Sequence, residues 1–121
     1  MALILAIDDA RTMRELVRTI LESEGHTVLT ANDGTTGELL ANEHKADLVI
    51  TDINMDEMDG ITLATNLRKL DNYKTIPILM LTTEMSDEKK SEARAAGASG
   101  WLNKPFSPPK LIGAVNKLLD R

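Results

Sequence analysis

Five short apolar runs recur along the chain at intervals of about 20 to 30 residues, which is the length of a strand plus a crossover helix. The runs begin near Leu3, Val28, Leu48, Ile78 and Gly100. Strands connected in this way lie parallel, because an antiparallel hairpin needs only a short loop. The spacing therefore predicts five βα units, with a parallel sheet that carries helices on both faces.

Apolar residues between these runs recur every three or four positions, as they do on the buried face of a helix. Three stripes of this kind are Met13, Leu16, Val17, Ile20 and Leu21; Ile61, Ala64, Leu67 and Leu70; and Leu111, Ile112, Val115, Leu118 and Leu119. A shorter helix is predicted around Leu39 to Ala41, after Gly34. Four helices are therefore expected from apolar spacing alone.

Capping residues mark several helix ends. Gly25 is suited to end the first helix, and Ser107 followed by Pro108 is suited to begin the last one. Ser86 is a candidate N-cap for a further helix that ends at Ala96. The buried positions of this helix are mostly alanine, so we expect little apolar surface to anchor it, and we expect it to move readily.

The predicted fold is a doubly wound α/β sandwich, (βα)5 and flavodoxin-like, with a parallel five-stranded sheet of order 2-1-3-4-5. In that order the winding reverses between the first and third strands, and ligands bind beyond the carboxyl ends of the strands at this point. Asp8 and Asp9 follow the first apolar run, and Asp52 follows the third. We therefore expect these three acids to meet in one crevice.

Three carboxylates held close together repel one another unless a cation joins them. Mg²⁺ prefers oxygen ligands and commonly shares its shell with phosphate, so we predict that Asp8, Asp9 and Asp52 hold this ion. Taken singly, each acid is better explained as a helix cap or a solvated strand end, and only their joint placement favours a metal. Asp52 is the candidate nucleophile, because a carboxylate forms an acyl phosphate when a metal neutralises the incoming charge.

Two further polar residues follow the later strands. Thr82 ends the fourth apolar run, where its hydroxyl is placed to donate a hydrogen bond to a phosphoryl oxygen, although alone it reads as an ordinary strand residue. Lys104 would supply a fixed positive charge opposite the acids, whereas an isolated lysine is usually a solvated loop residue. Pro105 restricts Lys104, and the sequence leaves the isomer of their peptide bond open.

Composition excludes several classes of function. The 14 basic and 19 acidic residues give a net charge of −5, which argues against direct nucleic-acid binding. The sequence has no cysteine, so disulfides and thiolate metal sites are excluded, and a cytoplasmic location is expected. It also lacks the run of about twenty apolar residues that a membrane span needs. We expect a single domain over residues 1–121, with no output domain, acting as a monomer.

With these residues placed, the chain resembles the response regulator receiver domains of two-component signalling, and among them the single-domain chemotaxis (CheY-like) type. The resemblance rests on Asp8-Asp9, Asp52, Thr82, Met58-Asp59-Gly60 and Lys104-Pro105-Phe106. It implies that Asp52 is the phospho-acceptor, that Thr82 is the switch hydroxyl, and that Lys104 holds phosphoryl oxygens. It also implies Mg²⁺ bound by Asp9, Asp52 and the backbone carbonyl of Asn54, with Asp8 acting through water.

The same resemblance implies partners and a switch. The phosphoryl group would come from a histidine kinase, a phosphatase is a further partner of such proteins, and the target would be a protein such as the flagellar motor switch. Trp101 is similar to the aromatic residue whose rotation reports phosphorylation in the family. Glu84 and Asn54 occupy positions that influence dephosphorylation there. The predicted switch and partner face consists of Trp101, Glu84, Lys89 and Lys90. Asp56 departs from the proline that is frequent at its position.

Other functions remain open at this point. A receiver of this kind also acts as a phosphate sink or in a pathway unrelated to motility. A Mg²⁺-dependent phosphohydrolase with an aspartyl-phosphate intermediate is disfavoured, because the segment after Asp52 has no second acid to protonate a leaving group. A receiver indifferent to phosphate is disfavoured because all the candidate site residues are present. The expectation is thus a signalling domain that catalyses its own phosphorylation and dephosphorylation rather than a true enzyme.

Overall fold

Five parallel strands form one sheet in the order β2-β1-β3-β4-β5, as predicted. The structure is a computed structural model that describes residues 1–83 and 86–120. The strands are β1 (Leu3–Ile7), β2 (Thr27–Ala31), β3 (Leu48–Asp52), β4 (Ile78–Thr82) and β5 (Gly100–Asn103). The helices are α1 (Arg11–Ser23), α2 (Gly34–Glu43), α3 (Gly60–Leu67), α4 (Asp87–Ala96) and α5 (Pro108–Leu118), with a short 3₁₀ turn, η1 (Asp71–Tyr73).

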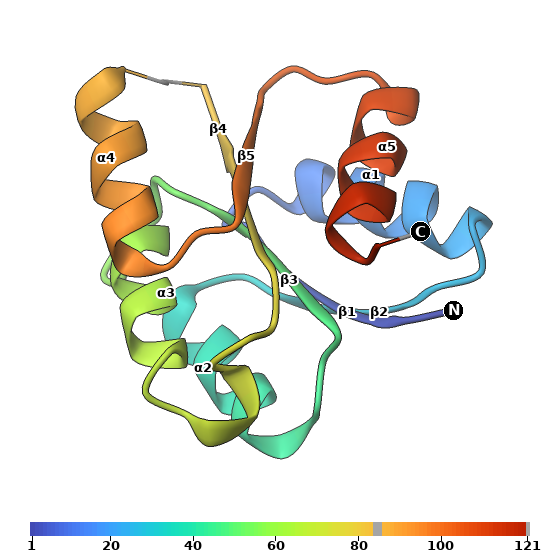
Figure 1. The fold of residues 1–121 in the computed structure, drawn as a ribbon. Coiled ribbons are helices and arrows are strands. Elements are labelled where there is room, and N and C mark those ends of the chain that lie inside the picture. The colour runs from blue at the N-terminus through green and yellow to red at the C-terminus, as the bar shows by residue number, and fades with distance from the viewer. Residues whose placement is uncertain (84–85, 121) are drawn as a thin grey trace.

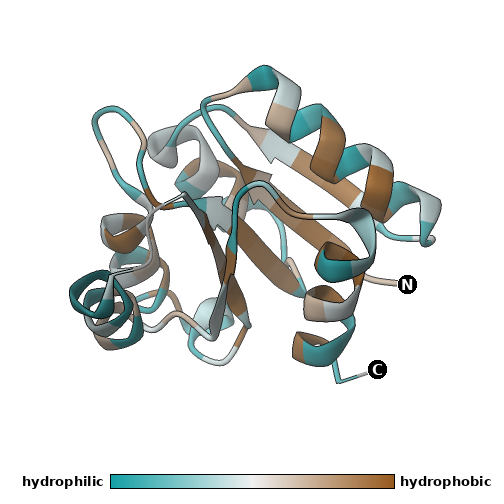
Figure 2. Cartoon of the chain, turned by 90° about the horizontal axis from the view of Figure 1, so that it is seen from above, coloured by the Kyte–Doolittle hydropathy of each residue, from teal (hydrophilic) through white to brown (hydrophobic). Residues whose placement is uncertain are grey.

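Helices cover both faces of the sheet (Figure 1). One face packs against α2, α3 and α4, and the other packs against α1 and α5. Alternation along the strands explains this division, because successive side chains point to opposite faces. In β1, Leu5 and Ile7 join the first cluster, whereas Ile4 and Ala6 join the second. Figure 2 shows the resulting apolar interior, in which the strands carry the most hydrophobic residues.

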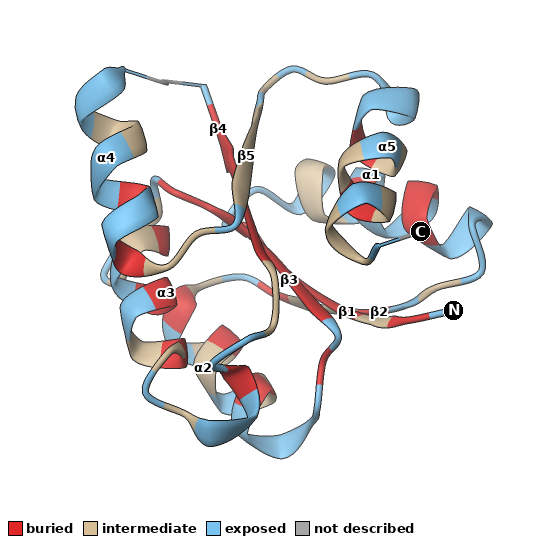
Figure 3. Ribbon diagram, in the orientation of Figure 1, coloured by how far each residue is buried: buried red, intermediate tan, exposed pale blue. Residues whose placement is uncertain are grey.

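Burial is deepest along the middle of the sheet (Figure 3). Every residue of β3 and of β4 is buried, whereas the edge strand β5 is only partly covered. A strand with helices on both faces has no solvated side, which is why these runs read as continuously apolar instead of alternating. None of the helices in the described residues is long and apolar enough to cross a membrane.

The helix boundaries agree with the capping signals, with two differences in the apolar stripes. Ser86 and Ser107 accept backbone hydrogen bonds as N-caps, and Gly25 follows α1 with a φ of +89°. Leu16, however, is 41% exposed, because α1 turns only one narrow stripe towards the sheet. Leu70 lies beyond the end of α3 and instead leads into the turn η1.

One arginine joins three backbone segments near the C-terminal ends of α3 and α4. Arg68, the C-cap of α3, donates from Nη1 to the carbonyl oxygens of Tyr73 and Ile76, at 2.6 and 2.7 Å. Its guanidinium also donates to the carbonyl oxygen of Gly97, which ends α4 with a φ of +105°. The side chain therefore fastens the C-terminal end of α4 to α3.

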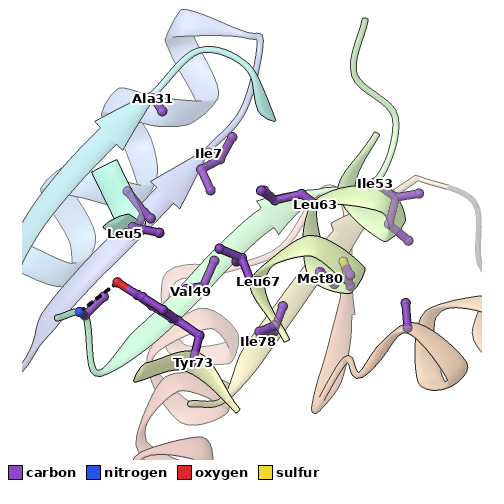
Figure 4. Packing of buried hydrophobic residues seen from close by; sticks show 14 of the residues in the cluster. Leu5, Ile7, Ala31, Val49, Ile53, Leu63, Leu67, Tyr73, Ile78 and Met80 are labelled. Atoms are coloured by element: carbon purple, nitrogen blue, oxygen red, sulfur yellow. Dashed lines mark hydrogen bonds between the residues drawn. The ribbon is translucent and has the colours of Figure 1, made fainter. Parts of the chain in front are cut away.

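Tyr73 is the only tyrosine in the chain, and its hydroxyl lies within the core next to the loop before β3 (Figure 4). The hydroxyl donates to the carbonyl oxygen of His44 at 2.7 Å and accepts from the amide of Ala46 at 3.2 Å. It thereby satisfies the buried amide of Ala46, which its apolar surroundings would otherwise leave unpaired, and the partly buried carbonyl of His44.

Replacing Tyr73 with phenylalanine should therefore destabilise the protein by about 1–3 kcal/mol, since the buried amide of Ala46 and the partly buried carbonyl of His44 lose their partner. Urea unfolding followed by circular dichroism measures this, and the denaturant slope should not change. A midpoint equal to that of the wild type would show that the hydroxyl contributes nothing to stability.

Candidate functional site

The predicted acids meet at the point where the winding of the sheet reverses. Asp8 directly follows β1, and Asp52 is the last residue of β3, which pairs with β1 so that Ile7 lies opposite Thr51. Each of Asp8, Asp9 and Asp52 offers a carboxylate oxygen, and the three oxygens lie within 4.8 Å of one another. Asp8 and Asp52 are buried, whereas Asp9 is exposed. The structure thus brings the three predicted acids together.

Lys104 reaches the same point from the loop after β5. Its Nζ lies 2.9 Å from Asp8 Oδ2 and 3.2 Å from Asp52 Oδ2, so a single ammonium joins the two buried carboxylates. The backbone amide of Lys104 donates to the carbonyl oxygen of Thr82 at 2.8 Å, and the Lys104–Pro105 peptide bond is cis. The lysine is therefore part of the site and is not a solvated loop residue.

Burial and neighbouring charges shift the titration of both partners. Burial raises the pKa of the Asp52 carboxyl, the ammonium of Lys104 opposes this rise, and the negative charge of Asp8 adds to it. Burial acts to lower the pKa of Lys104, but its hydrogen bond to Asp8 and the charge of Asp52 outweigh burial and raise it. Lys104 therefore stays charged.

The donor set fits Mg²⁺. Three carboxylates and one ammonium leave two negative charges at the site, and every candidate ligand is oxygen. The exposed carboxylate of Asp9 lies at the solvent side, where a magnesium ion can keep its waters. Asp9 does not cap α1: the N-cap is Ala10, which has no side-chain cap, and it is Asp8 Oδ1 that accepts from the Ala10 amide at 2.9 Å.

The two remaining residues of the predicted site lie on the neighbouring segments. Thr82 is fully buried at the end of β4, where it pairs with Asn103 of β5. Asn54 is exposed in the loop that joins β3 to α3. This loop is closed by a hydrogen bond from the amide of Gly60 to the carbonyl oxygen of Ile53 at 2.8 Å. Asn54 therefore follows β3, which carries Asp52, and Thr82 ends the neighbouring strand β4.

The predicted partner face is only partly assembled. Trp101, half-buried on β5, has Lys90 Nζ at 5.9 Å and the guanidinium carbon of Arg94 at 5.3 Å from its ring centroid. Such distances fit cation–π contacts. Lys89 points to a different neighbour, with its Nζ 3.6 Å from a carboxylate oxygen of Glu92. Glu84, which was also assigned to this face, lies outside the described residues.

Two arginines near these groups were missed from the sequence. Arg14 Nη1 donates to the backbone carbonyl of Asp8 at 2.8 Å, and Arg94 covers the ring of Trp101. Arg94 follows Lys90 by one helical turn, so the spacing could have revealed it. The signal for Arg14 is its position. It is the second cation, after Arg11, near the start of a helix, where acidic residues are favoured.

Comparison with known proteins agrees with this fold and this arrangement of acids. Residues 4–116 match the family model described as the response regulator receiver domain. The chain belongs to this family, whose members are phosphorylation-controlled switches of two-component signalling, receive the phosphoryl group from a histidine kinase and bind Mg²⁺ at an acidic site.

Several relatives are chemotaxis proteins. The chain is 37% identical to the chemotaxis protein CheY-3 of Vibrio cholerae, covering 98% of this chain and 92% of the relative. It is 35% identical to CheY of Pseudomonas aeruginosa, covering 98% and 96%. The solved structure of chemotaxis protein CheY4 of Vibrio cholerae superposes with a TM-score of 0.96 at 42% identity, covering 98% of both chains.

Proposed function

We propose that the chain is a signalling switch that accepts a phosphoryl group on Asp52 and that Asp8, Asp9, Asp52 and the backbone carbonyl of Asn54 bind the Mg²⁺ this requires. The observation that carries the proposal is the meeting of three carboxylates whose oxygens lie within 4.8 Å of one another, two of them in contact with the Lys104 ammonium. We assign the acceptor role to Asp52 because it ends the central strand β3 and its buried carboxylate lies close to the other two acids and Lys104 in the same site.

In the transfer, a carboxylate oxygen of Asp52 attacks the phosphorus of a phosphohistidine on the kinase, and the P–N bond breaks as the imidazole leaves with its electron pair. Bound Mg²⁺ supplies positive charge that neutralises the approaching phosphoryl oxygens. Lys104 exchanges its contact with Asp52 for one to a phosphoryl oxygen, keeping its anchor on Asp8. The hydroxyl of Thr82 donates to another phosphoryl oxygen.

The switch itself would use α4 and Trp101. The buried residues of α4 are Ala93 and Ala96, so little apolar surface holds this helix in place. Movement of Thr82 and its loop towards the phosphoryl group would shift an existing equilibrium of α4 and so change the surface formed by Lys90, Arg94 and Trp101. The change in this surface is the proposed output.

The pathway we propose is chemotaxis, with a protein target such as the flagellar motor switch, because several relatives are chemotaxis proteins. Phosphotransfer profiling against candidate kinases identifies the donor. A pulldown with and without beryllofluoride, which mimics the phosphoryl group, identifies the target. A partner retained only with beryllofluoride would define the output, whereas rapid phosphotransfer without any such partner would favour a phosphate sink.

Changing Asp52 to asparagine should reduce phosphorylation by a small phosphodonor such as acetyl phosphate at least about 100-fold, because the amide lacks the nucleophilic oxygen. Intact-protein mass measures the stoichiometry directly. Asp71→Asn is a matched control, since Asp71 is exposed and lies before the N-terminal end of β4, whereas Asp52 lies at the C-terminal end of β3. Equal stoichiometry in Asp52→Asn and wild type would show that the acceptor is another residue.

A further inference from the structure

Asp8 is held by four hydrogen bonds from different parts of the chain. Its amide donates to the carbonyl oxygen of Ala31 at 3.1 Å, its Oδ1 accepts from Ala10, and its Oδ2 accepts from Lys104. Its carbonyl oxygen accepts from Nη1 of Arg14 at 2.8 Å. The carbonyl group of Asp8 belongs to the peptide unit that leads into Asp9, so the Arg14 contact acts directly on the link between the two acids.

Arg14 occupies a position that its own helix disfavours. The first turn of α1 contains no acidic residue, and Arg11 and Arg14 place two cations near the positive end of the helix dipole. Residues that break a local preference are usually compensated by an interaction elsewhere in the fold. Here the compensation is visible, because Arg14 is half-buried against the backbone of the site.

The surroundings of Arg14 are strongly acidic. It shares a cleft of about 330 Å³ with Asp9, Asn32, Asp33, Asp56 and Glu57. Asp33 is engaged as the N-cap of α2, where its Oδ1 accepts from the amide of Thr36 at 2.7 Å. Asp9, Asp56 and Glu57 are exposed, and the guanidinium is the cation among the cleft residues. It can therefore stay in place without a buried carboxylate partner.

We propose that Arg14 is a positioning residue for the Mg²⁺ site: by gripping the carbonyl of Asp8, its guanidinium holds the turn that aims the carboxylate of Asp9 at the ion. This inference rests on the proposed function. Asp9 is exposed, and its side chain makes no hydrogen bond or ion pair within residues 1–83 and 86–120. The backbone turn is therefore what determines where its carboxylate lies. Residues that orient metal ligands contribute to the metal affinity of a site.

Charge and positioning predict opposite effects when Arg14 is removed. A cation close to the acids repels Mg²⁺, so its loss through charge alone would strengthen Mg²⁺ binding. Loss of the hydrogen bond to the Asp8 carbonyl would instead leave the turn between Asp8 and Asp9 less ordered. Mg²⁺ binding would then be weaker, because ordering this turn would cost free energy when the ion binds. The direction of the change in affinity therefore distinguishes a positioning role from a purely electrostatic one.

The test is calorimetric titration with Mg²⁺ alone of the wild type, Arg14→Gln, Arg14→Lys and Arg11→Gln. We expect Arg14→Gln to raise the Kd about tenfold, in line with other residues that orient metal ligands. Arg14→Lys keeps the charge and one donor, so its Kd should lie between those of the wild type and Arg14→Gln. Arg11→Gln is the matched control, because Arg11 carries the same charge in the same helix turn but is exposed; its Kd should not rise.

A second readout uses the metal-free protein. The amide of Ala10, bonded to Asp8 Oδ1, should exchange its hydrogen several-fold faster in Arg14→Gln than in wild type or Arg11→Gln, since the turn is then less ordered. Equal or tighter Mg²⁺ binding by Arg14→Gln, or unchanged exchange at Ala10, overturns the inference alone. A wild type that binds no Mg²⁺ overturns the proposed function and this inference with it.

Discussion

Replacing Lys104 with methionine should destabilise the metal-free protein by about 3 kcal/mol, because the two buried carboxylates of Asp8 and Asp52 would lose the only ammonium that joins them in the described site. The same change should strengthen Mg²⁺ binding, since a competing cation is gone. Saturating Mg²⁺ should therefore recover much of the lost stability. Phosphorylation should fall, because the proposed contact of Lys104 with the phosphoryl oxygens is lost.

The stability lost in Lys104→Met should also depend on pH. Burial already raises the pKa of Asp52, and removing the opposing charge of Lys104 raises it further. Between the unfolded and the folded pKa the native state binds more protons than the unfolded state, so stability falls as pH rises through that window. The penalty of Lys104→Met should accordingly be smallest in acid, where Asp52 is protonated.

Urea unfolding in EDTA and in excess Mg²⁺, at several pH values, measures these effects together. Lys74→Met is a suitable control, because Lys74 is exposed and follows η1 at the opposite edge of the sheet. A midpoint for Lys104→Met in EDTA equal to that of this control would mean that the buried contacts of Lys104 do not stabilise the fold.

Replacing Gly60 with alanine should cost about 3 kcal/mol and displace the end of β3. Gly60 begins α3, and a Cβ built on it would overlap the carbonyl oxygen of Asp52 and lie 3.0 Å from Cα of Ile53. Both neighbours are backbone atoms, so no side-chain rotation can relieve the overlap. We expect the shift of Asp52 to lower both Mg²⁺ affinity and the rate of phosphorylation.

Gly113→Ala provides the matched control. Gly113 lies inside α5, and a Cβ there would meet nothing within 4 Å. Alanine is favoured over glycine in a helix, so this variant should gain about 0.5–1 kcal/mol. Thermal unfolding measures the stability of the two variants, and Mg²⁺ titration measures their affinity for the ion. A Gly60→Ala variant as stable as Gly113→Ala would show that the loop between β3 and α3 accommodates the added Cβ at little cost.

Much of the fold and of the acidic site followed from the sequence, because both depend on repeating patterns. The spacing of the apolar runs requires crossover connections, and parallel order then brings the residues after β1 and β3 together. Asp8, Asp9 and Asp52 were predicted on this basis, and Lys104 from its place after the last apolar run. The structure brings the four residues together.

What the sequence did not predict depends on side-chain direction over short distances. Arg14 donates to a backbone carbonyl, and a carbonyl group has no sequence signature. The exposure of Leu16 depends on how α1 is rotated about its own axis against the sheet. The spacing of apolar residues does not determine this rotation to better than a fraction of a turn. Likewise, the approach of Arg94 to Trp101 depends on how α4 leans over β5.

The way Arg68 ties down α4 has a consequence for how that helix can come loose. Both buried side chains of α4, Ala93 and Ala96, lie in its last turns, next to the Gly97 carbonyl that Arg68 grips. We therefore expect the first turns of α4 to open at a lower free energy than its last turn, which Arg68 holds in place. A force applied near Ser86 would displace the N-terminal turns of α4 and leave the central strands β3 and β4 in place.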